Sequence, residues 1–98
     1  MNHYGKQAQN HWARWRPTQY QQISEPETFF TKLGQETAQQ IATLAADLAG
    51  DDPPGETYLQ KMGRLGRARQ QAEEIVLAET ILLPPEPGME DAGSLPAS

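Results

Sequence analysis

Apolar residues recur along residues 25–49 at the spacing of one helix face, and this stripe restricts the fold more than any other feature. Small alanines widen the stripe and allow a second helix to approach closely. Ser24 and Glu27 form a capping-box pattern at its start, and Gly50 is a typical residue just after a helix end. We therefore expect a helix over residues 25–49. Its stripe consists of Phe30, Leu33, Thr37, Ile41, Leu44 and Leu48.

A turn rich in Asp, Pro and Gly separates this segment from a second long helix, expected over residues 54–83. A short connection of this kind makes two helices antiparallel neighbours. A shorter helix is expected over residues 4–15, because Pro17 pushes the preceding residue out of the helical region. The predicted fold is therefore all-α, a three-helix arrangement. The two long helices form an antiparallel hairpin, and the N-terminal helix packs across it.

The domain organisation follows from the same pattern. Residues 1–83 are expected to form a single helical domain of a size at which the core is thin. Residues 17–23 connect the first two helices and contain Tyr20 and Ile23, which can pack onto the bundle. Residues 84–98 are rich in proline and acidic, with few large apolar groups, so we expect a disordered tail.

Several classes of function are disfavoured by the composition. The chain has no cysteine, which excludes disulfides, thiolate catalysis and Cys-based zinc sites. No apolar run reaches the length that spans a bilayer and no signal peptide opens the chain, so we expect a soluble, cytoplasmic protein without membrane contact.

Catalytic and metal sites are not predicted either. His3 and His11 are eight residues apart and lack a third ligand, which disfavours a metal site. Ser24 is already explained as a helix cap. Glu73 and Glu74 are adjacent, so their side chains leave the helix in different directions and do not form a catalytic pair. We therefore expect no enzyme activity, no cofactor and no small-molecule substrate.

The net charge of −5 conceals an alternation along the chain. Residues 1–24 hold three cations and no acid, whereas residues 25–57 hold seven acids and one lysine. Residues 58–72 hold four cations, and residues 73–98 hold six acids and no base. An acidic total argues against strong non-specific binding of nucleic acid. It leaves open that the two basic segments converge on one face.

Cations beside aromatic side chains are the composition of a phosphate-binding patch with stacking groups. In the alternative interpretation, these cations form interhelical and surface ion pairs with the acidic helix, each worth about 0–1 kcal/mol. The candidate nucleic-acid-binding residues are Arg14, Arg16, Lys61, Arg64, Arg67, Trp12 and Trp15.

Polar residues also interrupt the apolar stripe of the last helix. Arg69 and Glu79 occupy stripe positions, where a plain core would have apolar side chains. A buried cation needs a partner. Glu73, the N-terminal helix and a second copy of the chain are the alternatives for Arg69. The candidate polar seam or partner interface consists of Arg69, Glu73, Glu74 and Glu79.

Gly63 and Gly66 are unusual in a helix interior, where glycine costs about 1 kcal/mol relative to alanine. They indicate close approach by a bulky neighbour, with Trp12 or Trp15 as the natural candidates. A hinge in the long helix is the alternative.

Three segments together resemble the TnpV family of transposon-encoded proteins over about residues 4–83. The first is Tyr4-Gly5 followed by Arg16-Pro17-Thr18-Gln19-Tyr20. The helix Phe30–Leu48 occupies the place of that family's middle helix. The most specific segment is Ala72-Glu73-Glu74-Ile75-Val76, which follows Gln60-Lys61-Met62 and Arg69 and precedes Glu79 and Ile81. The resemblance implies a small accessory protein of a mobile genetic element, without an established reaction.

Two hypotheses on function follow. The first is a non-enzymatic accessory protein of a mobile genetic element that binds DNA or the DNA-processing machinery. The alternative is a protein–protein adaptor or homodimeric helical module without nucleic-acid contact.

Overall fold

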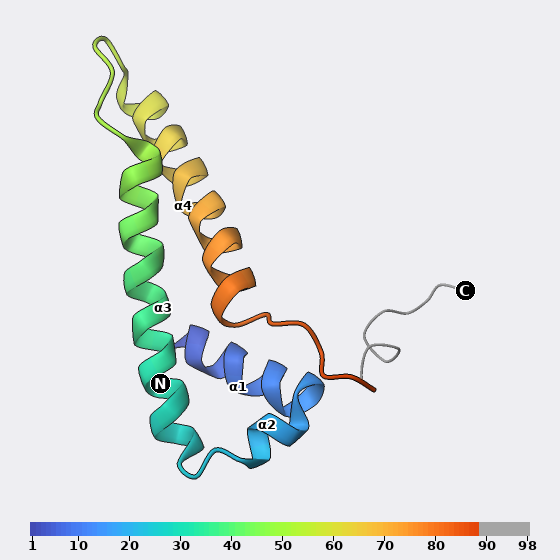
Figure 1. Cartoon of the computed structure of the whole chain (residues 1–98). Coiled ribbons are helices and arrows are strands. Elements are labelled where there is room, and N and C mark those ends of the chain that lie inside the picture. Colours follow the sequence, from blue (N-terminus) through green and yellow to red (C-terminus); the bar gives the residue numbers. More distant parts are fainter. Residues whose placement is uncertain (89–98) are drawn as a thin grey trace.

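The computed structural model describes residues 1–88, in which all regular secondary structure is helical. The all-α prediction is confirmed for these residues, and no strand occurs in them. Helices α3 and α4 lie side by side in opposite directions, and α1 crosses α3 near the end of α4 (Figure 1). The four helices are α1 (His3–Trp15), α2 (Pro17–Gln21), α3 (Pro26–Ala49) and α4 (Tyr58–Thr80).

The short helix α2 was not predicted from the sequence, which indicated only a connector. Arg16 separates it from α1, and Pro17 occupies its first turn, where the fixed φ of proline suits a helix start. The prediction that Tyr20 and Ile23 pack onto the bundle is confirmed. The Tyr20 ring stacks on Phe30 with centroids 5.9 Å apart, and Ile23 packs against the core.

Helix α3 begins without the predicted capping box. Its N-cap residue is Glu25, and no side chain caps the first turn. Pro26 takes the first helical position and keeps Glu25 outside the helix, so Ser24 lies one residue too far from the free backbone N–H groups.

Helix α4 begins at Tyr58, four residues later than expected. The Gln60 backbone N–H donates to Thr57 Oγ1 over 3.1 Å, and the Thr57 N–H donates to Gln60 Oε1 over 3.0 Å. These reciprocal bonds form the capping box that the Ser24 prediction placed elsewhere. Gly55, with φ +78°, prevents an earlier start because its backbone is left-handed. The helix ends at Thr80 rather than residue 83.

The buried core lies at the end of the α3–α4 pair where α1 crosses (Figure 1). No residue between 42 and 67 is buried. Each long helix therefore leaves the core about halfway along its length, and the loop end of the pair, called the tip below, has no core of its own. The core residues are Tyr4, Ala8, Phe30, Ile41, Ala72, Val76, Leu77 and Ile81.

Two glycines bring the backbones of α1 and α3 into contact. A Cβ added at Gly34 would lie 2.7 Å from the backbone nitrogen of Gly5 and 3.0 Å from its Cα. A Cβ at Gly5 would lie 2.5 Å from the carbonyl oxygen of Phe30. Asn2 fastens the same crossing, since its Oδ1 accepts from Gly5 N–H and its Nδ2 donates to the Gly34 carbonyl.

The predicted packing of a tryptophan against Gly63 and Gly66 is wrong. A Cβ at Gly66 would meet nothing within 4 Å, and one at Gly63 would meet only the end of the Arg67 side chain, at 3.3 Å. Trp12 instead packs against Phe29 and Phe30, each with centroids 5.5 Å away. Since α1 lies at the opposite end of the pair, its aromatic residues do not reach these glycines.

Leu83–Glu86, called the strap below, follows α4 and docks on the junction of α1 and α2. The prediction of disorder from residue 84 is therefore wrong for this segment, whereas residues 89–98 lie outside the described residues. Hydrogen bonds anchor the strap, because its carbonyl oxygens and the Glu86 carboxylate accept from groups of α1, α2 and the residue between them. The hydrogen-bonded pairs are Leu83 O with His11 Nε2 (2.8 Å), Pro84 O with Arg16 Nη1, Glu86 N with Trp15 O (2.9 Å), and the Glu86 carboxylate with the N–H groups of Thr18 (3.1 Å) and Gln19 (2.9 Å).

Candidate functional site

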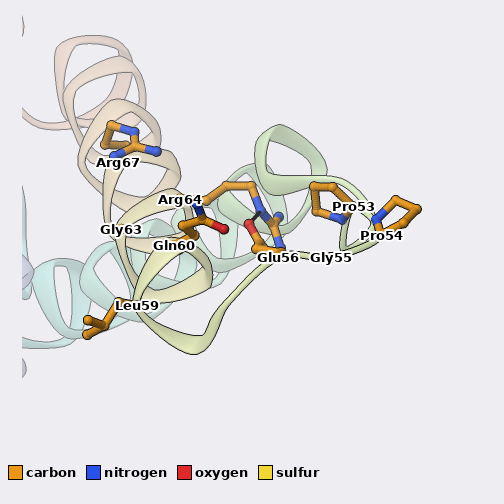
Figure 2. A pocket seen from close by; sticks show the side chains of 9 residues that line it. All are labelled: Pro53, Pro54, Gly55, Glu56, Leu59, Gln60, Gly63, Arg64 and Arg67. Atoms are coloured by element: carbon orange, nitrogen blue, oxygen red, sulfur yellow. Dashed lines mark hydrogen bonds and ion pairs between the residues drawn. The ribbon is translucent and has the colours of Figure 1, made fainter.

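Arg64 organises the tip through four hydrogen bonds. Figure 2 shows its side chain beside that of Glu56. Its guanidinium donates to both carboxylate oxygens of Glu56, at 2.8 and 2.9 Å, and to Asp52 at 2.7 Å. Its Nη1 also donates to the carbonyl of Ala49 over 2.5 Å, which satisfies an acceptor at the end of α3. Lys61 donates to the second oxygen of Asp52 over 2.7 Å. This cluster closes the loop between α3 and α4.

The charges in this cluster balance internally. The hydrogen bond from Arg64 lowers the pKa of Glu56, and those from Lys61 and Arg64 lower the pKa of Asp52. Hydrogen bonding to Glu56 raises the pKa of the Arg64 guanidinium. The Arg64 side chain is only 18% exposed and that of Glu56 only 9%. Lys61 and Arg64 are therefore engaged with acids and do not form the outward basic strip that the sequence predicted.

Arg67 is the third predicted cation of that strip and is exposed. Figure 2 shows it apart from the Arg64–Glu56 pair, at one side of an open pocket lined by the loop and the first turns of α4. Among residues 1–88 it makes no ion pair. Leu59 lines the same pocket, but its side chain points away from the arginines in this view.

Large apolar side chains are exposed at the tip, although several were predicted to face the core. Tyr58, Met62 and Leu65 share one face of α4 by their spacing, and Leu59 flanks Met62. They are exposed because neither α1 nor any other described element covers this half of the pair. We call the following residues the tip patch: Leu48 (41% exposed), Tyr58 (73%), Leu59 (80%), Met62 (40%) and Leu65 (37%).

Arg14 and Arg16 lie at the opposite end of the molecule. The Arg14 guanidinium lies 4.7 Å from the centroid of Trp15, and that of Arg16 lies 5.8 Å from Trp12. Arg16 also donates to Gln19 over 2.7 Å and to the strap. From Arg64 to the end of α4 the helix rises about 24 Å, and the strap follows beyond it. The two groups of predicted cations therefore do not converge on one face.

In the predicted polar seam, Arg69, Glu74 and Glu79 are exposed and Glu73 is half-buried. The Tyr4 hydroxyl donates to the Glu73 carboxylate over 2.9 Å and accepts from Arg69 Nη2 over 3.1 Å. Burial, followed by the hydrogen bond to Glu73, raises the pKa of Tyr4. Of the alternatives for Arg69, the structure supplies the N-terminal helix. Glu74 and Glu79 are both exposed.

The acids that engage Arg64 were not predicted from the sequence. Glu56 precedes Arg64 by eight residues and lies outside the helix, so helical spacing gives no signal for this pair. Asp52 lies in the same loop. The available signal was the concentration of acids in a short turn that precedes a basic first half of a helix.

The histidines have ordinary structural roles. His3 packs against the Tyr4 ring with centroids 3.9 Å apart, and His11 hydrogen-bonds the strap. In residues 1–88 no three His, Asp or Glu side chains are grouped so that they could hold a metal ion. None of the four helices in this part of the chain combines the length and apolar character that crossing a membrane requires.

Comparison of the chain with protein-family models, curated proteins and solved structures found no match. The resemblance to the TnpV family therefore stays a prediction.

Proposed function

We propose that this chain is a non-enzymatic protein-interaction module that works through the tip patch. Its working unit is the hairpin of α3 and α4, with α1 packed across the other end. Given the resemblance to TnpV, its setting is a mobile genetic element and its partners are proteins of the DNA-processing machinery. The observation that carries the proposal is the absence of any buried residue between 42 and 67 in two otherwise regular helices.

The physical argument starts from the stability of helices. Short helices in water are held mainly by packing of an apolar face. The tip has such a face, but within the chain it is covered only in part. The largest apolar patch on a typical monomer covers about 300–600 Å² and is often a functional site. The neutralised cluster around Arg64 supports a protein partner over a phosphate backbone at this end.

Affinity capture tests this proposal. The full chain is used as bait in nuclease-treated extracts, beside Leu59→Glu in the tip patch and Leu82→Gln as a control just beyond the other end of α4. Each captured protein is then purified and its binding measured directly. We expect binding that survives nuclease treatment and Leu82→Gln but is lost with Leu59→Glu. Binding that nuclease abolishes, or that Leu59→Glu leaves unchanged, contradicts the proposal.

A second candidate function is contact with nucleic acid at the end of α1. The supporting observation is Arg14, which is exposed and lies over the Trp15 ring. Fluorescence anisotropy with single- and double-stranded oligonucleotides at about 50 mM salt tests it. Arg14→Ala should weaken binding, whereas Lys32→Ala, an exposed cation on α3, should not. No measurable affinity at this salt concentration rejects the candidate.

A further inference from the structure

We propose that the tip opens as a unit of its own while the core stays folded, and that the hydrogen bonds of Arg64 keep it closed. In this motion the loop leaves Arg64 and the first turns of α4 unwind at Gly63 and Gly66. The opening is independent of whether the tip patch binds a partner. It divides that patch, however, because Leu48 belongs to α3 and the other four residues belong to α4.

Different interactions stabilise the two ends of the α3–α4 pair. At the end where α1 crosses, buried apolar side chains form the core. At the tip, no residue between 42 and 67 is buried. The ion pairs found in residues 1–88 are all at the tip, and each involves Arg64 or Lys61. Segments with few buried apolar contacts open locally at a lower free energy than the core does. Closing of the tip is therefore not tied to folding of the core by shared apolar burial.

Arg64 joins three parts of the tip. It extends from α4, and its Nη1 donates to the carbonyl of Ala49 at the end of α3. Its other nitrogens donate to Asp52 and Glu56 in the loop. Its side chain is only 18% exposed, so solvent weakens these charged hydrogen bonds less than it would at an open surface. Without the guanidinium, the Lys61–Asp52 pair is the ion pair that still joins the loop to α4.

Gly63 and Gly66 weaken the same part of α4. Glycine loses more backbone freedom in a helix than other residues do, and it is among the least favourable residues there. Packing does not require either glycine, because a Cβ at Gly66 would meet nothing within 4 Å and one at Gly63 would meet only the Arg67 side chain. The consequence of the two glycines for the fold is therefore a helix that unwinds more readily beside Arg64 than in the core.

Native-state hydrogen exchange of the full chain, measured by NMR, tests whether the tip opens separately. Amides of residues 62–66 report on the tip and those of residues 72–77 on the core, and both sets lie inside α4. We expect protection factors at least about tenfold lower in the tip set. Ile81→Val, a change in the core, should speed exchange of the core set about twofold to tenfold and leave the tip set unchanged. An equal change in both sets would show that the chain opens as one unit, which overturns the inference.

Two arginine variants test whether Arg64 keeps the tip closed. Arg64→Met removes the guanidinium and should speed exchange of the tip set about tenfold or more. Arg67→Met is the matched control and should leave it unchanged, because Arg67 is exposed on the same helix and makes no ion pair in residues 1–88. The inference is overturned if Arg64→Met has no effect on the tip set or if Arg67→Met has the same effect.

Salt provides a test on the unchanged chain. Raising sodium chloride from about 0.05 to 1 M screens the charges of the cluster and should speed exchange of the tip set about threefold or more. In Arg64→Met the same change of salt should have a smaller effect. This measurement decides the matter even if Arg64→Met does not fold, because a tip set that does not respond to salt in the unchanged chain also overturns the inference.

Discussion

Alanine substitution at Gly34 and at Gly66 should change stability in opposite directions, although both glycines lie inside long helices. In helix interiors alanine is favoured over glycine by about 1 kcal/mol, and both substitutions gain this term. At Gly66 nothing opposes the gain, because the added Cβ meets no atom within 4 Å. We expect Gly66→Ala to stabilise the chain by up to about 1 kcal/mol.

At Gly34 the added methyl group meets atoms that do not move easily. The nitrogen and Cα of Gly5 lie 2.7 and 3.0 Å from the new Cβ and belong to the backbone of α1. The helices must separate, and overpacking of this kind costs about 1–3 kcal/mol. The crossing also places Tyr4 and Ala8 in the core, so separation loosens that packing as well. We expect a net destabilisation of about 1–2 kcal/mol for Gly34→Ala.

Urea denaturation at a single chain concentration measures both changes. With a slope of about 1 kcal/mol per molar urea for a chain of this size, the midpoint should fall by about 1–2 M for Gly34→Ala and rise by up to about 1 M for Gly66→Ala. If Gly34→Ala raises the midpoint as much as Gly66→Ala does, then α1 and α3 are not in backbone contact at this crossing.

Three further predictions concern local contacts. Thr57→Ala should lower the free energy of unfolding by about 0.5–2 kcal/mol in urea titrations, because it removes the side chain that caps α4. Ser24→Ala should leave the free energy of unfolding unchanged, because Ser24 caps no helix. Equal effects of the two substitutions would show that Thr57 does not cap α4. Desolvation opposes ionisation of Glu86, but the hydrogen bonds from the backbone of Gln19 and Thr18 lower its pKa overall. The ionised Glu86 carboxylate therefore stabilises the fold above the ordinary glutamate pKa of 4.5, and this stabilisation is lost as the pH falls through the lower pKa of Glu86 in the folded chain. The urea midpoint of Glu86→Gln should accordingly decline less in acid than that of the unchanged chain. Trp12→Phe should change the unfolding free energy by less than about 1 kcal/mol. The buried indole N–H has no hydrogen-bond partner in residues 1–88, so removing this unpaired group offsets the packing lost with the smaller ring. A destabilisation above about 3 kcal/mol would show that the indole N–H does have a partner.

Periodicity was sufficient to predict the helical class and the extent of α3, because the apolar stripe from Phe30 to Ile41 is also the buried stripe. The same pattern failed from Leu48 onwards. A stripe shows which face of a helix is apolar, but it does not show whether another element covers that face. At the tip no described element does, so residues expected in the core form an exposed patch.

The candidate site depended on contacts that helical spacing does not encode. The cations of α4 were visible in the sequence, but their neutralisation requires the loop to fold back so that Glu56 reaches Arg64. The two glycine pairs show the same limit. Gly63 and Gly66 were the conspicuous ones because they stand close together, whereas the contact of Gly5 with Gly34 joins residues 29 positions apart and only the fold brings it about.

The composition of the core also determines the order in which this chain can fold. Its side chains come from three segments, near Tyr4, near Phe30 and between Ala72 and Ile81, whereas the residues around the local turn of the hairpin contribute none. Closing the turn first therefore yields little stabilisation, although this loop is shorter than the stretches of chain that separate the three core segments. The stabilising contacts span up to about three quarters of the chain, a topology that slows folding relative to a simple helical hairpin. During synthesis, the core remains incomplete until Ile81 has been added and can pack against the helices already made.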